Sequence, residues 1–214
     1  VALAASRING RLVSPGEVFS FNDALGDVSS STGFQPAYVI NGGRTVLGDG
    51  GGVCQVSTTL FRAALNAGLP VIERFPHSYR VGYYEQDSPP GFDATVYSPS
   101  YDLKFKNDTP HHILIQAETD TQNLTLVFRL FGMKDGRQVE ITKPVIYSQT
   151  PPPSDLYQDD PTLPIGVVRQ VDWKAWGTKV NFDYKVTKNG EVTNKQSFFS
   201  NYQPWQAVFL KGTK

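Results

Sequence analysis

The sequence predicts an α+β fold, in which an antiparallel sheet packs on one long helix that carries Cys54 at its N-terminus, followed by a small all-β module. Two patterns predict this fold. Apolar residues recur at the helical period in one long segment, residues 53–67. Most of the remaining chain consists of short β-rich runs bounded by turns, which the 19 Gly and 15 Pro help to form.

The first elements precede that helix. Residues 2–9 have the pattern of the last turns of a helix, which Gly10 would close in the left-handed conformation. Residues 34–47 predict a hairpin, because two β-rich runs flank Asn41-Gly42-Gly43. The glycine run 50–52 then leads into the helix, which Gly68 and the following proline would stop.

Strands are expected from residue 71 onward. The β-rich runs cover residues 71–75, 94–97, 102–106, 112–118 and 123–131. We expect Asp135-Gly136 to form a hairpin turn between the last of these runs and residues 138–147.

The C-terminal third divides into two segments. Residues 147–164 hold five prolines and three acidic residues without periodicity, which indicates a semi-rigid linker in partly polyproline conformation. Residues 179–186 alternate polar and apolar, and Asn189-Gly190 turns the chain into a second strand. We therefore predict a domain at 1–146, a linker at 147–164 and a small β module at 165–214. So small a module is expected to pack against the rest of the chain or a neighbour.

Composition excludes several function classes. The 20 Lys and Arg balance the 20 Asp and Glu, so the electrostatic footprint of a nucleic-acid binder is missing. One cysteine forms neither an internal disulfide nor a thiolate zinc site, and the three histidines lack metal-ligand spacing, so we expect neither metal nor other cofactor. No run approaches the ~18 apolar residues that span a membrane, so any membrane anchor would lie outside this sequence.

Cys54 is the strongest chemical candidate. A helix N-terminus favours the thiolate, and the preceding glycines give close access and leave backbone N–H groups near one point. We predict that Gly51, Gly52 and Val53 supply oxyanion contacts. The alternative is an inert buried thiol, because free cysteines are often core residues.

A cysteine nucleophile needs a base. His77 follows Pro76 in a loop, 23 residues after Cys54. Its role as the base and its interpretation as an ordinary surface-loop histidine are about equally supported. His111 and His112 are better explained as a solvated strand end. Asp93 or Asp49 could orient the base, although for either aspartate alone turn capping is the better explanation.

Four motifs resemble one known family. The runs NGRLVSPGEVFSFNDALG, GGGVCQVSTTLFRAALNAGL, ERFPHSYRV and DATVYSPSYDLKFKN are similar in sequence and spacing to the VanW domain, over about residues 7–131. The tail, with NGEV and SNYQPWQAVFLKG, is similar to the G5-type β module that often follows it.

The resemblance implies a function. VanW domains of some Gram-positive envelope proteins act as L,D-transpeptidases that cross-link diaminopimelate residues of peptidoglycan. It implies Cys54 as nucleophile, His77 as base and, more weakly, Asp93 as the orienting group. Better-known YkuD-type enzymes carry Ser-His-Gly-Cys, whereas Gly52 and Val53 precede the cysteine here. Their site details therefore do not transfer.

The expected substrate is a tetrapeptide stem that loses D-alanine and is joined to a second stem, with water as an alternative acceptor in a carboxypeptidase side reaction. Contacts to this substrate are expected from Gln55, Ser57, Ser78 and Tyr83. The expected location is the extracellular cell envelope. Two rivals remain: a non-catalytic wall-binding module with a buried Cys54, and a scaffold that binds other envelope proteins through its C-terminal module.

Overall fold

The computed structural model describes residues 1–41 and 44–214, and for residues 37–41, 44–47 and 49 it describes the backbone alone. The helices are α1 (Ala2–Ile8), α2 (Phe21–Leu25) and α3 (Val53–Asn66). The first eight strands are β1 (Arg11–Val13), β2 (Val18–Ser20), β3 (Pro36–Asn41), β4 (Arg44–Asp49), β5 (Val71–Glu73), β6 (Lys104–Lys106), β7 (Ile113–Asp120) and β8 (Thr125–Phe131). The remaining strands are β9 (Gln138–Ile141), β10 (Val145–Thr150), β11 (Leu156–Asp160), β12 (Val168–Asp172), β13 (Gly177–Lys188), β14 (Glu191–Tyr202) and β15 (Val208–Gly212).

Strands dominate the described residues, and the predicted α+β arrangement is wrong. The strands form several small sheets, in the orders β1-β7-β8, β2-β6-β5, β3-β4, β10-β13-β14 with β9 also on β13, and β11-β15-β12. Cys54 is the second residue of α3, but this helix has only 14 residues and does not serve as one long support for one sheet. Short runs bounded by turns specify an extended backbone without specifying which strands pair, which is why the sequence pattern misled.

One predicted hairpin is also wrong. Asp135-Gly136 does not join two paired strands, because β8 pairs with β7 and β9 pairs with β13. Gly136 does have a positive φ of 79°, so the dipeptide turns the chain without pairing its flanks. The turn at 42–43 of the other predicted hairpin lies outside the described residues, although β3 and β4 pair as antiparallel strands around it.

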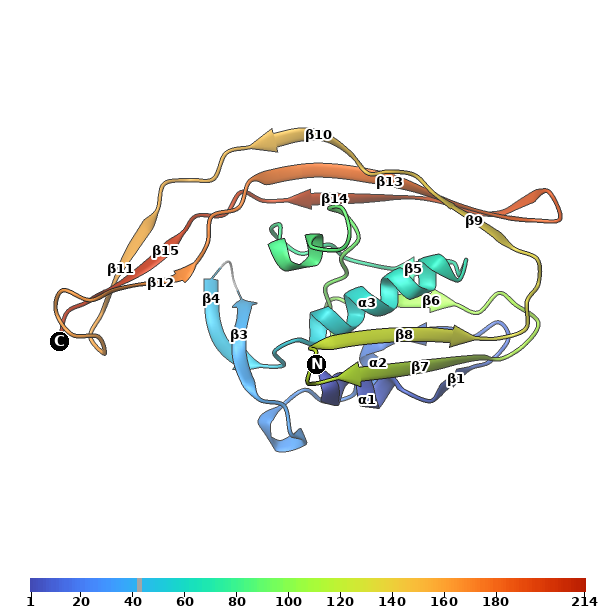
Figure 1. The fold of residues 1–214 in the computed structure, drawn as a ribbon, viewed down its shortest axis with the longest axis horizontal. Helices are drawn as coiled ribbons and strands as arrows, with labels where there is room; N and C mark the ends of the chain where they lie inside the picture. The colour runs from blue at the N-terminus through green and yellow to red at the C-terminus, as the bar shows by residue number, and fades with distance from the viewer. Residues whose placement is uncertain (42–43) are drawn as a thin grey trace.

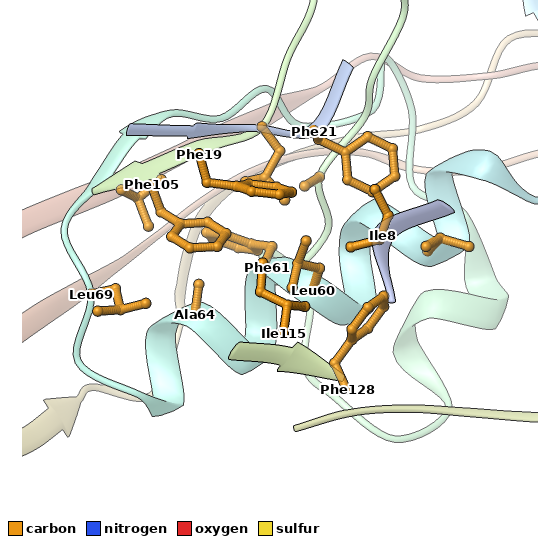
Figure 2. Packing of buried hydrophobic residues seen from close by; sticks show 14 of the residues in the cluster. Ile8, Phe19, Phe21, Leu60, Phe61, Ala64, Leu69, Phe105, Ile115 and Phe128 are labelled. Carbon is orange, nitrogen blue, oxygen red and sulfur yellow. The ribbon is translucent and has the colours of Figure 1, made fainter. Parts of the chain in front are cut away.

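The main core gathers around the buried face of α3 (Figure 2). Leu60, Phe61 and Ala64 are completely buried on this helix. Phe105 of β6 stacks on Phe19 of β2 with ring centroids 4.8 Å apart, which joins two strands of the β2-β6-β5 sheet within the same core. This packing fixes α3, and with it the position of Cys54.

Strands β13 and β14 form a long ribbon that curves over α3 (Figure 1). The predicted alternation holds, because Val180, Phe182, Tyr184 and Val186 are all buried. Several of these side chains belong to the main core, so the ribbon packs against the preceding residues as its small size suggested. The turn Asn189-Gly190 has both φ angles positive, at 53° and 83°, as a tight hairpin requires.

The segment expected as a linker contains strands. Most of β10 and all of β11 lie within residues 147–164; β10 pairs with β13, and β11 runs parallel to β15. Paired strands, and not polyproline conformation, therefore order these two stretches. The division at 146 and 165 remains a prediction.

The sheet β11-β15-β12 lies at the far end of the molecule with the C-terminus (Figure 1). Tyr157 stacks on Phe209 there with centroids 5.0 Å apart, while Trp173 remains largely exposed. Among the described residues, no helix combines the length and apolar character needed to cross a membrane.

Candidate active site

Cys54 lies in the first turn of α3, where backbone N–H groups lack partners within the helix. Gly52 caps this turn in the left-handed conformation with φ 81°, and a Cβ there would come within 2.6 Å of a side-chain atom of Val1. The turn thus requires glycine at this position for both conformation and space. The backbone N–H of Val53 already donates to the Gly50 carbonyl at 3.1 Å, so it is engaged within the turn.

The segment that carries Asp93 is attached to the same helix. Ser57 Oγ donates to the Ala94 carbonyl at 2.6 Å, and the Ala94 backbone N–H donates to Thr58 Oγ1 at 3.0 Å. The next residue, Thr95, places its Oγ1 3.5 Å from Cys54 Sγ. Small polar side chains in the first two turns of α3 therefore set the distance between the thiol and residues 93–96.

His77 is buried against this segment, with 7% of its surface exposed. Its Nδ1 lies 2.6 Å from Asp93 Oδ2, and its backbone N–H donates to the same oxygen at 2.8 Å. The ring also packs on Tyr84, with centroids 4.9 Å apart. Because Nδ1 serves Asp93, Nε2 is the ring nitrogen left to act on Cys54.

The other carboxylate oxygen of Asp93 has two further donors. Arg74 Nη2 donates to Oδ1 at 3.0 Å, and the Tyr202 hydroxyl donates to the same atom. Arg74 also donates from Nε to the Asp93 carbonyl at 2.6 Å, so its guanidinium holds both the side chain and the backbone. Burial alone would raise the pKa of this carboxyl, but the hydrogen bond from His77 and the charge of Arg74 keep it well below its usual range.

These contacts favour the charged forms of both Cys54 and His77. Burial tends to raise the pKa of the Cys54 thiol, but the hydrogen bond and positive charge of His77 outweigh burial and bring it below its ordinary value. Burial tends to lower the pKa of His77, whereas hydrogen bonds with Asp93 and Cys54 raise it to about 9. The favoured state is a thiolate beside an imidazolium, the reactive form of a cysteine nucleophile.

The other predicted site residues divide into two groups. Gln55 and Ser78 are exposed, and Tyr83 is 53% exposed. Ser57 is completely buried and its hydroxyl donates to the Ala94 carbonyl, so its side chain faces the protein interior, and its contact with substrate stays a prediction. Its hydroxyl faces the backbone of a neighbouring segment because that segment packs directly on α3.

The remaining polar candidates lie elsewhere. His111 and His112 are both exposed, at the loop that precedes β7. The side chain of Asp49 lies outside the described residues. Among the described side chains, no group of three or more His, Cys, Asp or Glu is arranged to hold a metal ion.

Sequence reasoning missed Arg74, Thr95 and Tyr202. Arg74 had a local signal, because an arginine next to an apolar strand and close to His77 needs a partner when buried. Thr95 lies two residues after Asp93, in a run expected to form a strand. Tyr202 had no local signal, because its contact with Asp93 joins residues 109 positions apart.

Comparison with known proteins gives related sequences for the region that holds this site. A family model described as "VanW like protein" matches residues 1–129. The uncharacterized protein YoaR of Bacillus subtilis (strain 168) is 41% identical over 118 residues, which are 55% of this chain and 38% of that protein. Vancomycin B-type resistance protein VanW of Enterococcus faecalis (strain ATCC 700802 / V583) is 35% identical over 123 residues, 57% of this chain and 45% of that protein. The chain thus spans less than half the length of either relative.

Among solved structures, two G5 domains are similar to part of this chain. The G5 domain of IgA1 protease has 20% identity and a TM-score of 0.23, and the match covers 39% of this chain and 99% of that domain. HP0197-G5 has 18% identity and a TM-score of 0.18, with 36% and 97% covered.

Proposed function

Because this chain belongs to the VanW-like family, we propose that it is a cell-wall protein that acts as a cysteine-dependent L,D-transpeptidase of peptidoglycan. The observation that carries the proposal is the arrangement of three side chains: His77 Nδ1 lies 2.6 Å from the buried Asp93 carboxylate, and His77 lowers the pKa of the partly buried Cys54 thiol. A catalytic triad of this type activates a thiol for attack on a carbonyl carbon. A merely structural cysteine would not need a histidine that is itself held by a buried carboxylate.

The first half of the proposed reaction forms a thioester. The Cys54 thiolate attacks the carbonyl carbon at the L-centre of diaminopimelate in a tetrapeptide stem, and the carbonyl oxygen takes the negative charge. Backbone N–H groups of Gly52 and Cys54 would stabilise this oxyanion, since the Val53 N–H is engaged by Gly50. The tetrahedral intermediate expels D-alanine when the His77 imidazolium gives its proton to the departing amine.

The second half consumes the thioester. The side-chain amine of a second stem attacks the thioester carbonyl, neutral His77 accepts the proton that the amine loses, and Cys54 leaves as thiolate. The new amide is the cross-link, and the thiolate–imidazolium pair is restored. With water in place of the amine, the same steps release a tripeptide, so a carboxypeptidase side activity follows from the same chemistry.

The proposal includes a division of labour along the chain. Residues 1–146 would be the catalytic unit, and residues 165–214 a G5-like β module. Exposed Gln55, Ser78 and Tyr83 would line the path of the stem peptide next to Cys54. We place the protein in the extracellular cell envelope, where its stem-peptide substrates are found.

Purified protein incubated with tetrapeptide-bearing muropeptides provides the test. Mass spectrometry should find dimers that have lost D-alanine with the wild type, and none with Cys54→Ala. His77→Ala should reduce the rate at least 100-fold, since general acid–base catalysis contributes roughly that much. His112→Ala is the matched control, because His112 is exposed and outside the site, and it should leave the rate unchanged.

Equal product from the wild type and Cys54→Ala would rule the proposal out. A second readout needs no substrate: a thiol-reactive probe at neutral pH should label native Cys54 rapidly, and more slowly in His77→Ala. A thiol that stays unlabelled in the folded wild type would favour a non-catalytic, wall-binding role.

A further inference from the structure

The carboxylate of Asp93 collects donors from both the family-matched region and the C-terminal strands. Oδ2 accepts the ring and backbone N–H groups of His77 at 2.6 and 2.8 Å. Oδ1 accepts Arg74 at 3.0 Å and the hydroxyl of Tyr202. Since Tyr202 is the last residue of β14, beyond the matched residues 1–129, the C-terminal strands reach the interior of the candidate site.

We propose that Tyr202 is a positioning residue that acts through Asp93 on the Cys54–His77 pair, so that the C-terminal strands are a working part of the active site. This inference rests on the proposed function only in taking that pair as the reactive group. It assigns a role in the reaction to a segment outside the matched family region.

Packing fixes where the Tyr202 hydroxyl lies. The side chain is buried, with 4% of the residue exposed, and it pairs with Thr178 in the β13–β14 register. Four residues earlier on β14, Phe198 packs its ring edge-on against Phe61 of α3, with centroids 5.5 Å apart. The helix that carries Cys54 and the strand that carries Tyr202 are therefore held together by the hydrophobic core.

The chain just after β14 also holds the loop that carries His77. The backbone N–H of Gln203 donates to the Ser78 carbonyl at 2.7 Å. Trp205 stacks on Tyr79 with centroids 4.5 Å apart. The imidazole is thus fixed on one side through Asp93 and on the other through the two residues that follow it.

The hydroxyl also changes how strongly Asp93 holds the proton of His77. Each hydrogen bond donated to a carboxylate reduces its basicity, and Arg74 keeps the group charged even when one donor is lost. Burial and the nearby Asp93 charge raise the pKa of Tyr202 above its ordinary value, so its hydroxyl remains a proton donor throughout the neutral range. Removing it should make Asp93 a stronger acceptor for the imidazolium and widen the pH range of the charged pair.

The decisive variant is Tyr202→Phe, which keeps the packed ring and removes only the hydroxyl. Two midpoints are measured on the full chain: the titration of the His77 imidazole by NMR, and the acid limb of Cys54 alkylation by iodoacetamide. We expect the first to move up and the second to move down, each by about half a unit to one unit, as the loss of one hydrogen bond near a charge implies.

Tyr184→Phe is the matched control. Tyr184 lies on the neighbouring strand β13, is completely buried, and donates its hydroxyl to the Leu69 carbonyl at 3.1 Å. It should lose a similar amount of stability to Tyr202→Phe while leaving both midpoints in place. The proposal is overturned if Tyr202→Phe leaves the midpoints unchanged, or if both variants move them equally.

A second variant covers the case in which Tyr202→Phe does not fold. Replacement of Tyr202 by 3,5-difluorotyrosine preserves the shape and gives a more acidic hydroxyl, so the midpoints should move in the opposite directions; unchanged midpoints overturn the proposal. The two proposals fail separately. Shifted midpoints without cross-linked product would contradict the transpeptidase and leave the role of Tyr202 standing, while product with unshifted midpoints would do the reverse.

Discussion

The C-terminal strands have two ends with opposite surroundings. In the β13–β14 ribbon, Phe182, Phe198 and Tyr202 are buried against the preceding part of the chain. In the β11-β15-β12 sheet, Tyr157 is 56% exposed, and Trp173, the residue after β12, is 67% exposed. Elements that follow one another in sequence thus differ in whether their side chains face the core or solvent.

This difference shows that elements that are neighbours in the sequence do not all pack against the same part of the molecule. The predicted unit at 165–214 contains both environments, one over α3 and one at the far end of the molecule (Figure 1). Strands β13, β14 and β15 follow one another in the sequence, but β15 belongs to a different sheet. Side chains of β13 and β14 pack in the same core as α3. The effect of a substitution on stability and on the reaction rate should therefore depend on whether the residue lies near α3 or in the distal sheet.

The largest effect is expected where β14 meets the site, at Asp93. Asp93→Asn removes the charge that holds His77 protonated, so the pKa of His77 should fall from about 9 and the charged pair should be less populated at neutral pH. We expect kcat/KM for cross-linking to fall by about 10²- to 10⁴-fold, in line with the loss of an orienting carboxylate in other triads. A change of less than about twofold, measured with the muropeptide assay on folded protein, would contradict the triad.

The next effect concerns the contact between the ribbon and α3. Phe198→Ala removes a ring that packs on both Phe61 and Phe182, and should lower the free energy of unfolding by about 3–5 kcal/mol. Denaturant unfolding at constant pH measures this loss. Tyr157→Ala in the distal sheet is the comparison, and an equal loss there would remove the distinction between the two ends.

The pH dependence of the wild type should show two limbs. Activity requires the thiolate together with the imidazolium, so it should fall as pH rises through about 9, where His77 loses its proton. On the acid side, activity should fall only at a pH below the ordinary titration range of a thiol. Burial raises the pKa of Cys54, but His77 outweighs burial and lowers it. Rates of cross-linking measured from pH 5 to 10.5 test this, and activity that kept rising above pH 9.5 would argue against an imidazolium.

The smallest effect is expected at the distal end. Trp173→Ala changes a largely exposed side chain, so the free energy of unfolding should change by less than about 0.5 kcal/mol and the cross-linking rate should remain as in the wild type. Denaturant unfolding and the muropeptide assay measure the two quantities. A large loss of rate with normal stability would mean that the distal sheet takes part in the reaction after all.

Local sequence patterns predicted local structure well. The apolar period at 53–67 corresponds to α3, and the alternation at 179–186 corresponds to the buried face of β13. Both succeed because helix and strand periods depend on neighbours a few residues away. Strand pairing depends on distant segments, which explains why the predicted single sheet and the Asp135-Gly136 hairpin were wrong.

In the candidate site too, local patterns identified residues, whereas contacts between distant segments were not predictable. Cys54 stood out because glycines and a helix surround it, and His77 because it follows a proline within a short distance of the nucleophile. The structure brings both together with Asp93. Nothing in the sequence near SNYQPW ties Tyr202 to this group, because that contact exists only after β14 packs on α3.

The long sequence separation of Tyr202 from Asp93 also bears on the order in which the site is assembled. A chain synthesised from its N-terminus holds Cys54, His77 and Asp93 well before β14 exists, and the contact with Tyr202 closes a loop of 109 residues. Contacts of such high sequence separation are slow to form, because closing the loop costs entropy before the contact stabilises it. The full set of donors on Asp93 is therefore completed only after β14 has been synthesised, which leaves the thiol without its finished environment while the chain is still incomplete.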